Sequence, residues 1–218
     1  MRKAQLVLAA ALIATLFAPT RMRAQEGHTI VFFGDSLTAG YGLDAPEDDA
    51  YPALIQHKID SEGLPWKVVN AGLSGDTTAE GLRRVDWVLR QPVDLFVLAL
   101  GGNDGLRGIK PEVTESNLSA IIGRVRARYP WATIFLAGMQ MPPNMGEDYT
   151  QRFAAIFPSV AKKEHVELIP FLLEGVGGIP QYNQSDGIHP NATGHALIAK
   201  MLWPILRPHL LLKNSRPE

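Results

Sequence analysis

The sequence predicts an α/β fold in which helices cover both faces of a parallel sheet. Two observations lead to this prediction. Short apolar runs alternate with longer amphipathic segments along the chain, which is the order that successive βαβ units produce. One short run, residues 95–100, is apolar at every position, as expected for a strand that is buried on both faces of a parallel sheet.

Five short runs are predicted to be strands, at residues 29–34, 67–71, 94–101, 132–139 and 166–170. The segments between them are predicted to be helices, because they carry capping residues or a helical spacing of apolar positions. These markers are the capping-box pair Thr77 and Glu80, the series Leu118, Ile121, Ile122 and Val125, the run 149–163 with a kink at Pro158, and the cap Asn191.

Bulk composition fits one globular domain. The 218 residues are 46% hydrophobic and 20% charged, an ordinary balance for a chain with a single core. The formal net charge is −1, and the sequence has no basic stripe, which argues against a nucleic-acid partner. The chain has no cysteine, which excludes disulfides, a thiol nucleophile and cysteine-ligated metal sites.

Residues 1–24 are predicted to be a secretory signal peptide. Arg2 and Lys3 precede an apolar run at residues 6–18, which is too short to span a bilayer. Ala24 is a small residue suited to cleavage, although Met22 is not the small residue expected two positions earlier. A retained anchor and an ordinary helix are the alternatives. Cleavage would leave one domain, residues 25–218, in the periplasm or outside the cell, without stable membrane insertion.

Four polar, glycine-rich segments come directly after predicted strands or just before the last helix. They are residues 34–40, 70–76, 101–104 and 186–190. The carboxyl ends of parallel strands lie at one edge of the sheet, and ligands bind at that edge in open α/β sheets. The sequence therefore predicts that the four segments meet at one site.

Ser36, Asp186 and His189 are the candidate catalytic residues of these segments. Ser36 follows a strand and begins a predicted helix, whose N-terminal end favours developing negative charge. A serine hydroxyl is a weak nucleophile without a base, and His189 can supply one. Asp186 lies three residues earlier and can hold the imidazole tautomer. Each residue alone has a simpler interpretation as a helix cap or loop residue, so the prediction depends on their joint occurrence.

Acyl transfer also requires hydrogen-bond donors for the developing oxyanion. The predicted donors are the N–H groups of Ser36 and Gly72 and the side-chain amide of Asn103, although a glycine such as Gly72 is most often only a turn residue. Residues 105–110 and 141–145 follow strands at the same edge and are predicted to line a substrate groove. No histidine pair has the spacing of a metalloprotease helix, and neither a metal nor another cofactor is expected.

Taken together, the four segments resemble the SGNH, or GDSL-type, hydrolase family. Residues 34–37 match the first block of that family, Gly72 the second, residues 101–104 the third and residues 186–190 the fifth. Residues 100–108 resemble one subgroup, the bacterial periplasmic arylesterases and acyl-thioesterase/lysophospholipases. The resemblance implies a flavodoxin-like α/β/α fold with a five-stranded parallel sheet. It also implies cofactor-free hydrolysis of aryl esters, short- to medium-chain acyl esters, thioesters or lysophospholipids.

Three other functions share part of this pattern. A carbohydrate acetyl esterase of the same family would use the same catalytic residues. A non-catalytic binding module on the same fold would tolerate the loss of Ser36 or His189, yet both are present. A flavin- or nucleotide-binding protein would need a first loop that cradles phosphate, and residues 34–40 lack the lysine and glycine spacing of a P-loop.

Overall fold

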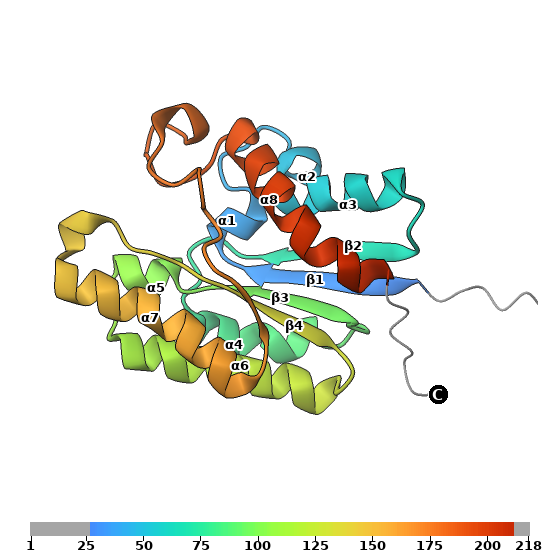
Figure 1. Ribbon diagram of the computed structural model, residues 1–218, viewed down its shortest axis with the longest axis horizontal. Helices are drawn as coiled ribbons and strands as arrows, with labels where there is room; N and C mark the ends of the chain where they lie inside the picture. The colour runs from blue at the N-terminus through green and yellow to red at the C-terminus, as the bar shows by residue number, and fades with distance from the viewer. Residues whose placement is uncertain (1–26, 212–218) are drawn as a thin grey trace, which may run out of the picture.

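The centre of the structure is a parallel sheet of five strands in the order β2-β1-β3-β4-β5 (Figure 1). The strands are β1 (His28–Gly34), β2 (Trp66–Gly72), β3 (Leu95–Ala99), β4 (Thr133–Ala137) and β5 (Glu167–Ile169). The computed structural model describes residues 27–211, so the predicted signal peptide and its cleavage point lie outside it. Within these residues, none of the helices has the length and apolar character that a membrane crossing requires.

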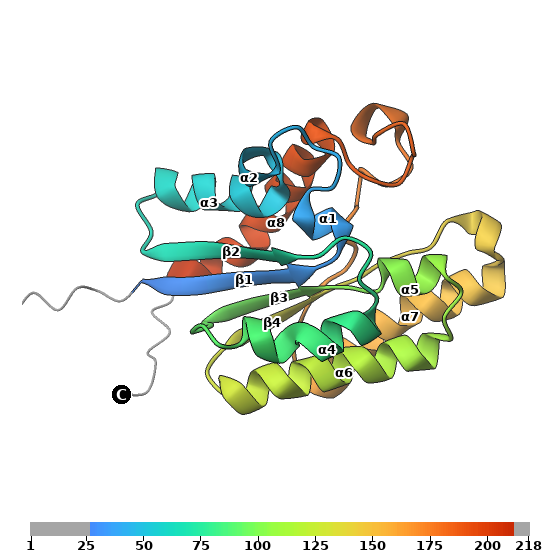
Figure 2. The same cartoon turned by 180° about the vertical axis from the view of Figure 1, so that it is seen from behind.

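Helices cover both faces of this sheet, as Figures 1 and 2 show from opposite sides. One layer contains α1 (Ser36–Ala39), α2 (Pro46–Asp49), α3 (Tyr51–Ser61) and α8 (Ala192–Leu211). The other contains α4 (Thr78–Val88), α5 (Gly102–Leu106), α6 (Pro111–Arg128) and α7 (Glu147–Glu164). Two short 3₁₀ helices, Pro143–Met145 and Pro180–Tyr182, lie in the connections. The predicted α/β/α architecture is therefore confirmed, with the strand order of flavodoxin-like folds.

The caps expected from the sequence form where they were predicted. Thr77 and Glu80 make a reciprocal capping box at the start of α4. The side chain of Asn191 accepts a hydrogen bond from the Gly194 N–H, at 3.0 Å, in the first turn of α8. Helix α7 continues through Pro158 as one element. These local signals were readable because each needs only residues three or four positions apart.

The strand predicted at residues 94–101 is shorter than expected. It ends at Ala99, and Gly101 takes a φ of 120°, a backbone conformation that residues with a Cβ rarely adopt. The chain then turns directly into the short helix α5, which the sequence analysis did not predict. As a result, Asn103 lies in the first turn of a helix and not in an extended loop.

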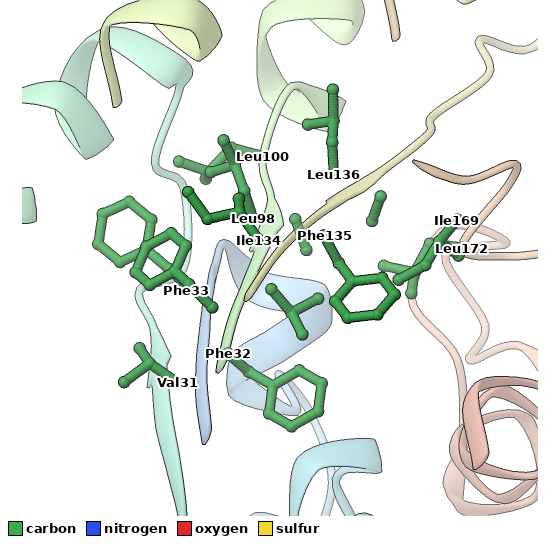
Figure 3. Packing of buried hydrophobic residues seen from close by; sticks show 14 of the residues in the cluster. Val31, Phe32, Phe33, Leu98, Leu100, Ile134, Phe135, Leu136, Ile169 and Leu172 are labelled. Atoms are coloured by element: carbon green, nitrogen blue, oxygen red, sulfur yellow. The ribbon is translucent and has the colours of Figure 1, made fainter. Parts of the chain in front are cut away.

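Buried apolar side chains pack between the sheet and its two helical layers (Figure 3). Phe32 and Phe33 of β1 are fully buried and point to opposite faces. The Phe32 ring meets Tyr51 of α3, with centroids 5.4 Å apart, whereas Phe33 lies under the guanidinium of Arg84 on α4, at 4.1 Å. Every residue of β3 is buried as well. The loops at the carboxyl edge of the sheet therefore start from a closely packed base.

Candidate active site

Ser36 is positioned by the turn that joins β1 to α1. It is the first residue of α1, and the preceding Asp35 caps that helix by accepting the Leu37 N–H at 3.0 Å. The strand order reverses between β1 and its neighbours β2 and β3, so this turn lies at the switch point of the sheet, where ligands bind in such folds. Within residues 27–211 the Ser36 N–H donates to no other group.

Ser36, His189 and Asp186 form one continuous hydrogen-bonded chain. The Nε2 atom of His189 lies 3.0 Å from Ser36 Oγ, and its Nδ1 lies 2.6 Å from Asp186 Oδ2. The other oxygen of Asp186 accepts the N–H groups of Ile188 and His189, at 2.9 and 3.0 Å. With the proton on Nδ1 bonded to Asp186, Nε2 is left as an acceptor for the Ser36 hydroxyl.

The environment of Asp186 keeps its carboxyl group ionised. Desolvation raises the pKa of Asp186, but the hydrogen bonds from the His189 side chain and from two backbone N–H groups outweigh it, and the pKa falls to about 2. A carboxylate that accepts several N–H bonds is stabilised in its charged form. Asp186 can therefore hold the imidazole tautomer and balance an imidazolium across the neutral pH range.

The pKa of Asp35 is shifted in the opposite direction. Its side chain is buried, and burial raises the pKa of Asp35 to about 7, against the lowering by the Leu37 N–H and by His189. Desolvation penalises the charged form of a buried carboxyl group, and here it outweighs both lowering effects. Near neutral pH, part of the Asp35 population is therefore uncharged. The two carboxyl groups near the nucleophile thus differ in charge because they differ in hydrogen bonding and burial.

Asn103 faces the same cavity as Ser36 and His189. Its Nδ2 donates to the backbone oxygen of Asp76 at 2.9 Å. An amide nitrogen carries two hydrogens, so one remains for a ligand. The neighbouring Asp104 is fully buried and accepts the N–H and hydroxyl of Thr78 at the start of α4, which makes it a structural support.

Gly72 does not present a free donor in this structure. Its N–H donates to the side-chain oxygen of Asn70 at 3.0 Å. A Cβ at this position would lie 2.3 Å from the Ala39 nitrogen, so close packing against α1 explains the glycine. Gly75, three residues later, has an N–H without a hydrogen-bond partner among the described residues. The bond to Asn70 counts against Gly72 as an oxyanion donor, whereas the N–H of Gly75 is free to donate.

An apolar cavity of about 410 Å³ opens beside the Ser36–His189 pair. Both segments predicted to line a groove contribute to its wall, through Leu106 and through residues 141–143. The sequence analysis missed a further part of the wall, which follows the short strand β5. It consists of Phe171, Leu173, Gly177 and Gly178. This segment carries no polar motif that could have pointed to it.

Tyr41 is a second feature of the site that the sequence analysis missed. Its ring packs against the imidazole of His189, with centroids 4.8 Å apart. The backbone oxygen of Tyr41 accepts the side-chain amide of Gln184 at 2.6 Å, and the same amide donates to the oxygen of Pro190 at 3.0 Å. Gln184 thus connects the segment after the nucleophile to the turn that carries His189. A tyrosine directly after the first glycine-rich segment was the only signal in the sequence.

Within residues 27–211, the structure has no cluster of three or more histidine, aspartate or glutamate residues that could hold a metal ion.

Comparison with known proteins adds to this description. The model of the GDSL-like lipase/acylhydrolase family matches residues 32–197. The chain is 41% identical to "Esterase TesA" of Pseudomonas aeruginosa, over 84% of this chain and 89% of that protein. It is 42% identical to "Thioesterase 1/protease 1/lysophospholipase L1" of Escherichia coli K12, over 85% and 86%. A crystal structure of TesA superposes with a TM-score of 0.79, at 41% identity, and covers 84% of this chain and all of that one.

A further solved structure is similar to this chain. It is the psychrotrophic esterase EstA of Pseudoalteromonas sp., inhibited by monoethylphosphonate, with a TM-score of 0.78 and 31% identity over 84% of this chain and 98% of that one.

Proposed function

This chain belongs to the GDSL-like lipase/acylhydrolase family, and we propose that it hydrolyses carboxylic esters through an acyl-enzyme formed on Ser36. The observation that carries the proposal is the hydrogen-bonded chain Ser36–His189–Asp186, which opens onto an apolar cavity. Its substrates are small acyl compounds: aryl esters, short- to medium-chain esters, thioesters or lysophospholipids. The named relatives are two esterases and one protein named as thioesterase, protease and lysophospholipase. These names do not favour a carbohydrate acetyl esterase.

The reaction follows from the positions of the three side chains. His189 Nε2 takes the proton of the Ser36 hydroxyl as Oγ attacks the acyl carbon, and Asp186 balances the imidazolium. The tetrahedral intermediate collapses, and His189 gives the proton to the departing alcohol or thiol. A water molecule then transfers its proton to His189 and attacks the acyl-enzyme. Collapse of the second intermediate releases the carboxylic acid and restores the Ser36 hydroxyl.

Three donors can hold the oxyanion in both steps. They are the N–H of Ser36, the second hydrogen of Asn103 Nδ2 and the N–H of Gly75, which replaces Gly72 in the assignment made from the sequence. The N–H groups of Ser36 and Gly75 have no other hydrogen-bond partner among residues 27–211. Donors that are already in place cost no reorganisation when the charge develops.

The apolar wall of the cavity suits the acyl chain of the substrate. Met139, Met141 and Leu173 are almost completely buried and line it. Methionine side chains are flexible and adapt to different shapes, so a wall of this kind accepts acyl groups of several lengths. Residues 1–24 are proposed to act as a cleaved signal peptide, and the enzyme therefore to work in the periplasm or outside the cell.

Kinetics and labelling of the purified protein test the proposal. We expect hydrolysis of p-nitrophenyl esters and acyl thioesters of graded chain length, and its loss in Ser36→Ala. An organophosphonate should label Ser36 with a stoichiometry of about one, as measured by intact mass and peptide mapping. Labelling at another residue, together with full activity of Ser36→Ala, would overturn the mechanism.

A crystal structure of the phosphonylated enzyme distinguishes Gly75 from Gly72. The phosphonyl oxygen stands where the oxyanion forms, so its donors should lie within about 3 Å of it. We expect the N–H groups of Ser36 and Gly75 and the Asn103 amide at that distance. A hydrogen bond from Gly72 in place of Gly75 would restore the assignment made from the sequence.

A further inference from the structure

The side chain of Asn103 is attached to a loop that an ion pair holds in place. Asn103 Nδ2 donates to the backbone oxygen of Asp76 at 2.9 Å. The carboxylate of Asp76 in turn accepts Nε of Arg84 at 2.5 Å, and its side chain is only 7% exposed. The position of the Asp76 backbone oxygen therefore fixes the orientation of the Asn103 amide and of its second, free hydrogen.

Arg84 also binds the strand that leads to the nucleophile. Its Nη2 donates to the backbone oxygen of Gly34 at 2.9 Å, two residues before Ser36. The same oxygen accepts the N–H of Leu73 at 3.0 Å, and the guanidinium lies over the ring of Phe33. A single side chain on α4 thus joins the end of β1 to the loop between β2 and α4.

The burial of this pair separates it from the ordinary ion pairs of the surface. The preceding residue on the same helix, Arg83, is 68% exposed and pairs with Glu80, whereas the Arg84 side chain is 20% exposed. A buried ion pair contributes little net stability compared with apolar residues of the same size. A planar guanidinium, however, holds two acceptors in a fixed relation to each other. The main effect of the Arg84–Asp76 pair is therefore to fix the relative positions of the groups that Arg84 binds, and its effect on stability is small.

We propose that Arg84 and Asp76 are positioning residues for oxyanion stabilisation, an inference that rests on the proposed function. The pair fixes the Asn103 amide and the Gly75 N–H relative to Ser36. Neither Arg84 nor Asp76 lines the cavity, so both act through the groups that they hold. A displacement of about 1 Å at a reacting group can cost about 10²-fold in rate, which makes the turnover sensitive to this pair.

Substitution of Arg84 tests the inference, with its neighbour as the matched control. In Arg84→Met we expect kcat on p-nitrophenyl butyrate to fall about 10- to 100-fold, while KM changes less than about twofold because the ground-state ester gains little from the oxyanion donors. Arg84→Lys should lie between this variant and wild type, since an ammonium lacks the planar fork. Arg83→Met should keep the wild-type kcat and KM.

A double-mutant cycle then asks through which group Arg84 acts. In an Asn103→Ala background, the additional effect of Arg84→Met on kcat should shrink at least threefold, because the amide that Arg84 positions is gone. An undiminished effect would show that Arg84 acts independently of Asn103. Each kcat is calculated per active site titrated by an organophosphonate, so that unfolded protein does not lower the measured value.

The outcomes separate this inference from the proposed function. Wild-type protein that neither hydrolyses esters nor reacts with the phosphonate at Ser36 would overturn the function. Active wild-type protein beside a folded Arg84→Met that keeps more than half of its kcat would overturn the positioning role alone. If Arg84→Met fails to fold, Arg84→Lys and Asp76→Asn decide, because both keep polar partners for the buried groups. A wild-type kcat in both Arg84→Lys and Asp76→Asn would also overturn the positioning role.

Discussion

The ring of Tyr41 lies against the imidazole of His189, with centroids 4.8 Å apart and planes inclined by 48°. The imidazole is therefore restrained twice, at Nδ1 by Asp186 and on its ring by an aromatic neighbour. An aromatic ring attracts a cation more strongly than a neutral group. The contact should thus stabilise the imidazolium that forms when Ser36 attacks.

Removal of the Tyr41 ring should slow the reaction. Cation–aromatic contacts at exposed sites contribute about 0.5–1 kcal/mol, and Tyr41 is 54% exposed, so Tyr41→Ala should lower kcat roughly 2- to 5-fold at constant pH. Tyr41→Phe keeps the ring and should stay within about twofold of wild type. Steady-state kinetics on one chromogenic ester measures both variants. Equal losses in the two would assign the effect to the hydroxyl group and not to the ring.

Asp186→Asn should lower kcat by about 10³- to 10⁴-fold, by analogy with the same exchange in serine protease triads. An uncharged amide neither balances the imidazolium nor selects the tautomer with the proton on Nδ1. Because the hydrogen bonds of Asp186 lower its pKa to about 2, the wild-type rate should show no inflection from this group between about pH 4 and pH 9. Activity of Asp186→Asn near the wild-type level would remove Asp186 from the mechanism.

Asn103→Ala should lower kcat and kcat/KM together. The loss of one oxyanion donor costs about 2.7–4 kcal/mol, or roughly 10²- to 10³-fold in kcat. KM should barely move, because the amide bonds the tetrahedral intermediate more strongly than the ground-state carbonyl. A thermal melt beside the kinetics separates catalysis from folding. A variant that melts like wild type and keeps most of its kcat would show that Asn103 is not a donor.

The pH dependence of stability should contain a component from His195. This residue is buried, its Nδ1 accepts the Tyr51 N–H at 3.2 Å, and burial lowers the pKa of His195 from 6.5 to about 4. Between these two values the unfolded chain binds a proton that the folded chain does not. The free energy of unfolding therefore falls as the pH drops from 6.5 to 4, by up to about 3 kcal/mol from this group.

A comparison with His195→Gln isolates that component. The raised pKa of Asp35, about 7, acts in the opposite sense, because the folded chain then binds the extra proton between pH 4 and 7. Asp35 is present in both proteins, so its contribution cancels in the difference. Urea unfolding should show His195→Gln less stable than wild type at pH 7.5, by a margin that shrinks by roughly 2–3 kcal/mol at pH 4. A margin independent of pH would contradict the neutral histidine.

Much of this site could be predicted from the sequence because its residues follow strands. Parallel topology brings the ends of β1 and β3 to one edge, and this alone places Ser36 near Asn103. His189 and Asp186 were recognisable as a pair because they share one turn. These predictions needed only local patterns and one topological rule.

The remaining features depend on tertiary contacts that no local pattern encodes. Gly72 matched a family block, yet its N–H is used within the fold by Asn70, a bond that only the coordinates reveal. Tyr41 and Phe171 belong to the site through side-chain packing across the edge of the sheet. Helix α5 was not predicted because its five residues are too few to show a helical period.

Gln184 connects the segment after Ser36 to the turn that carries His189, and this connection determines how the enzyme should lose activity as urea is added. Asp186 and His189 lie on the same turn, so the hydrogen-bonded chain Ser36–His189–Asp186 depends on one long-range contact, that between His189 and Ser36. The bond from Gln184 to Tyr41 is exposed and its bond to Pro190 is partly buried, whereas the central strand β3 is buried at every residue. Segments of this kind open well below the free energy of global unfolding. Turnover should therefore vanish at a lower urea concentration than the far-ultraviolet circular dichroism signal, and return at once on dilution.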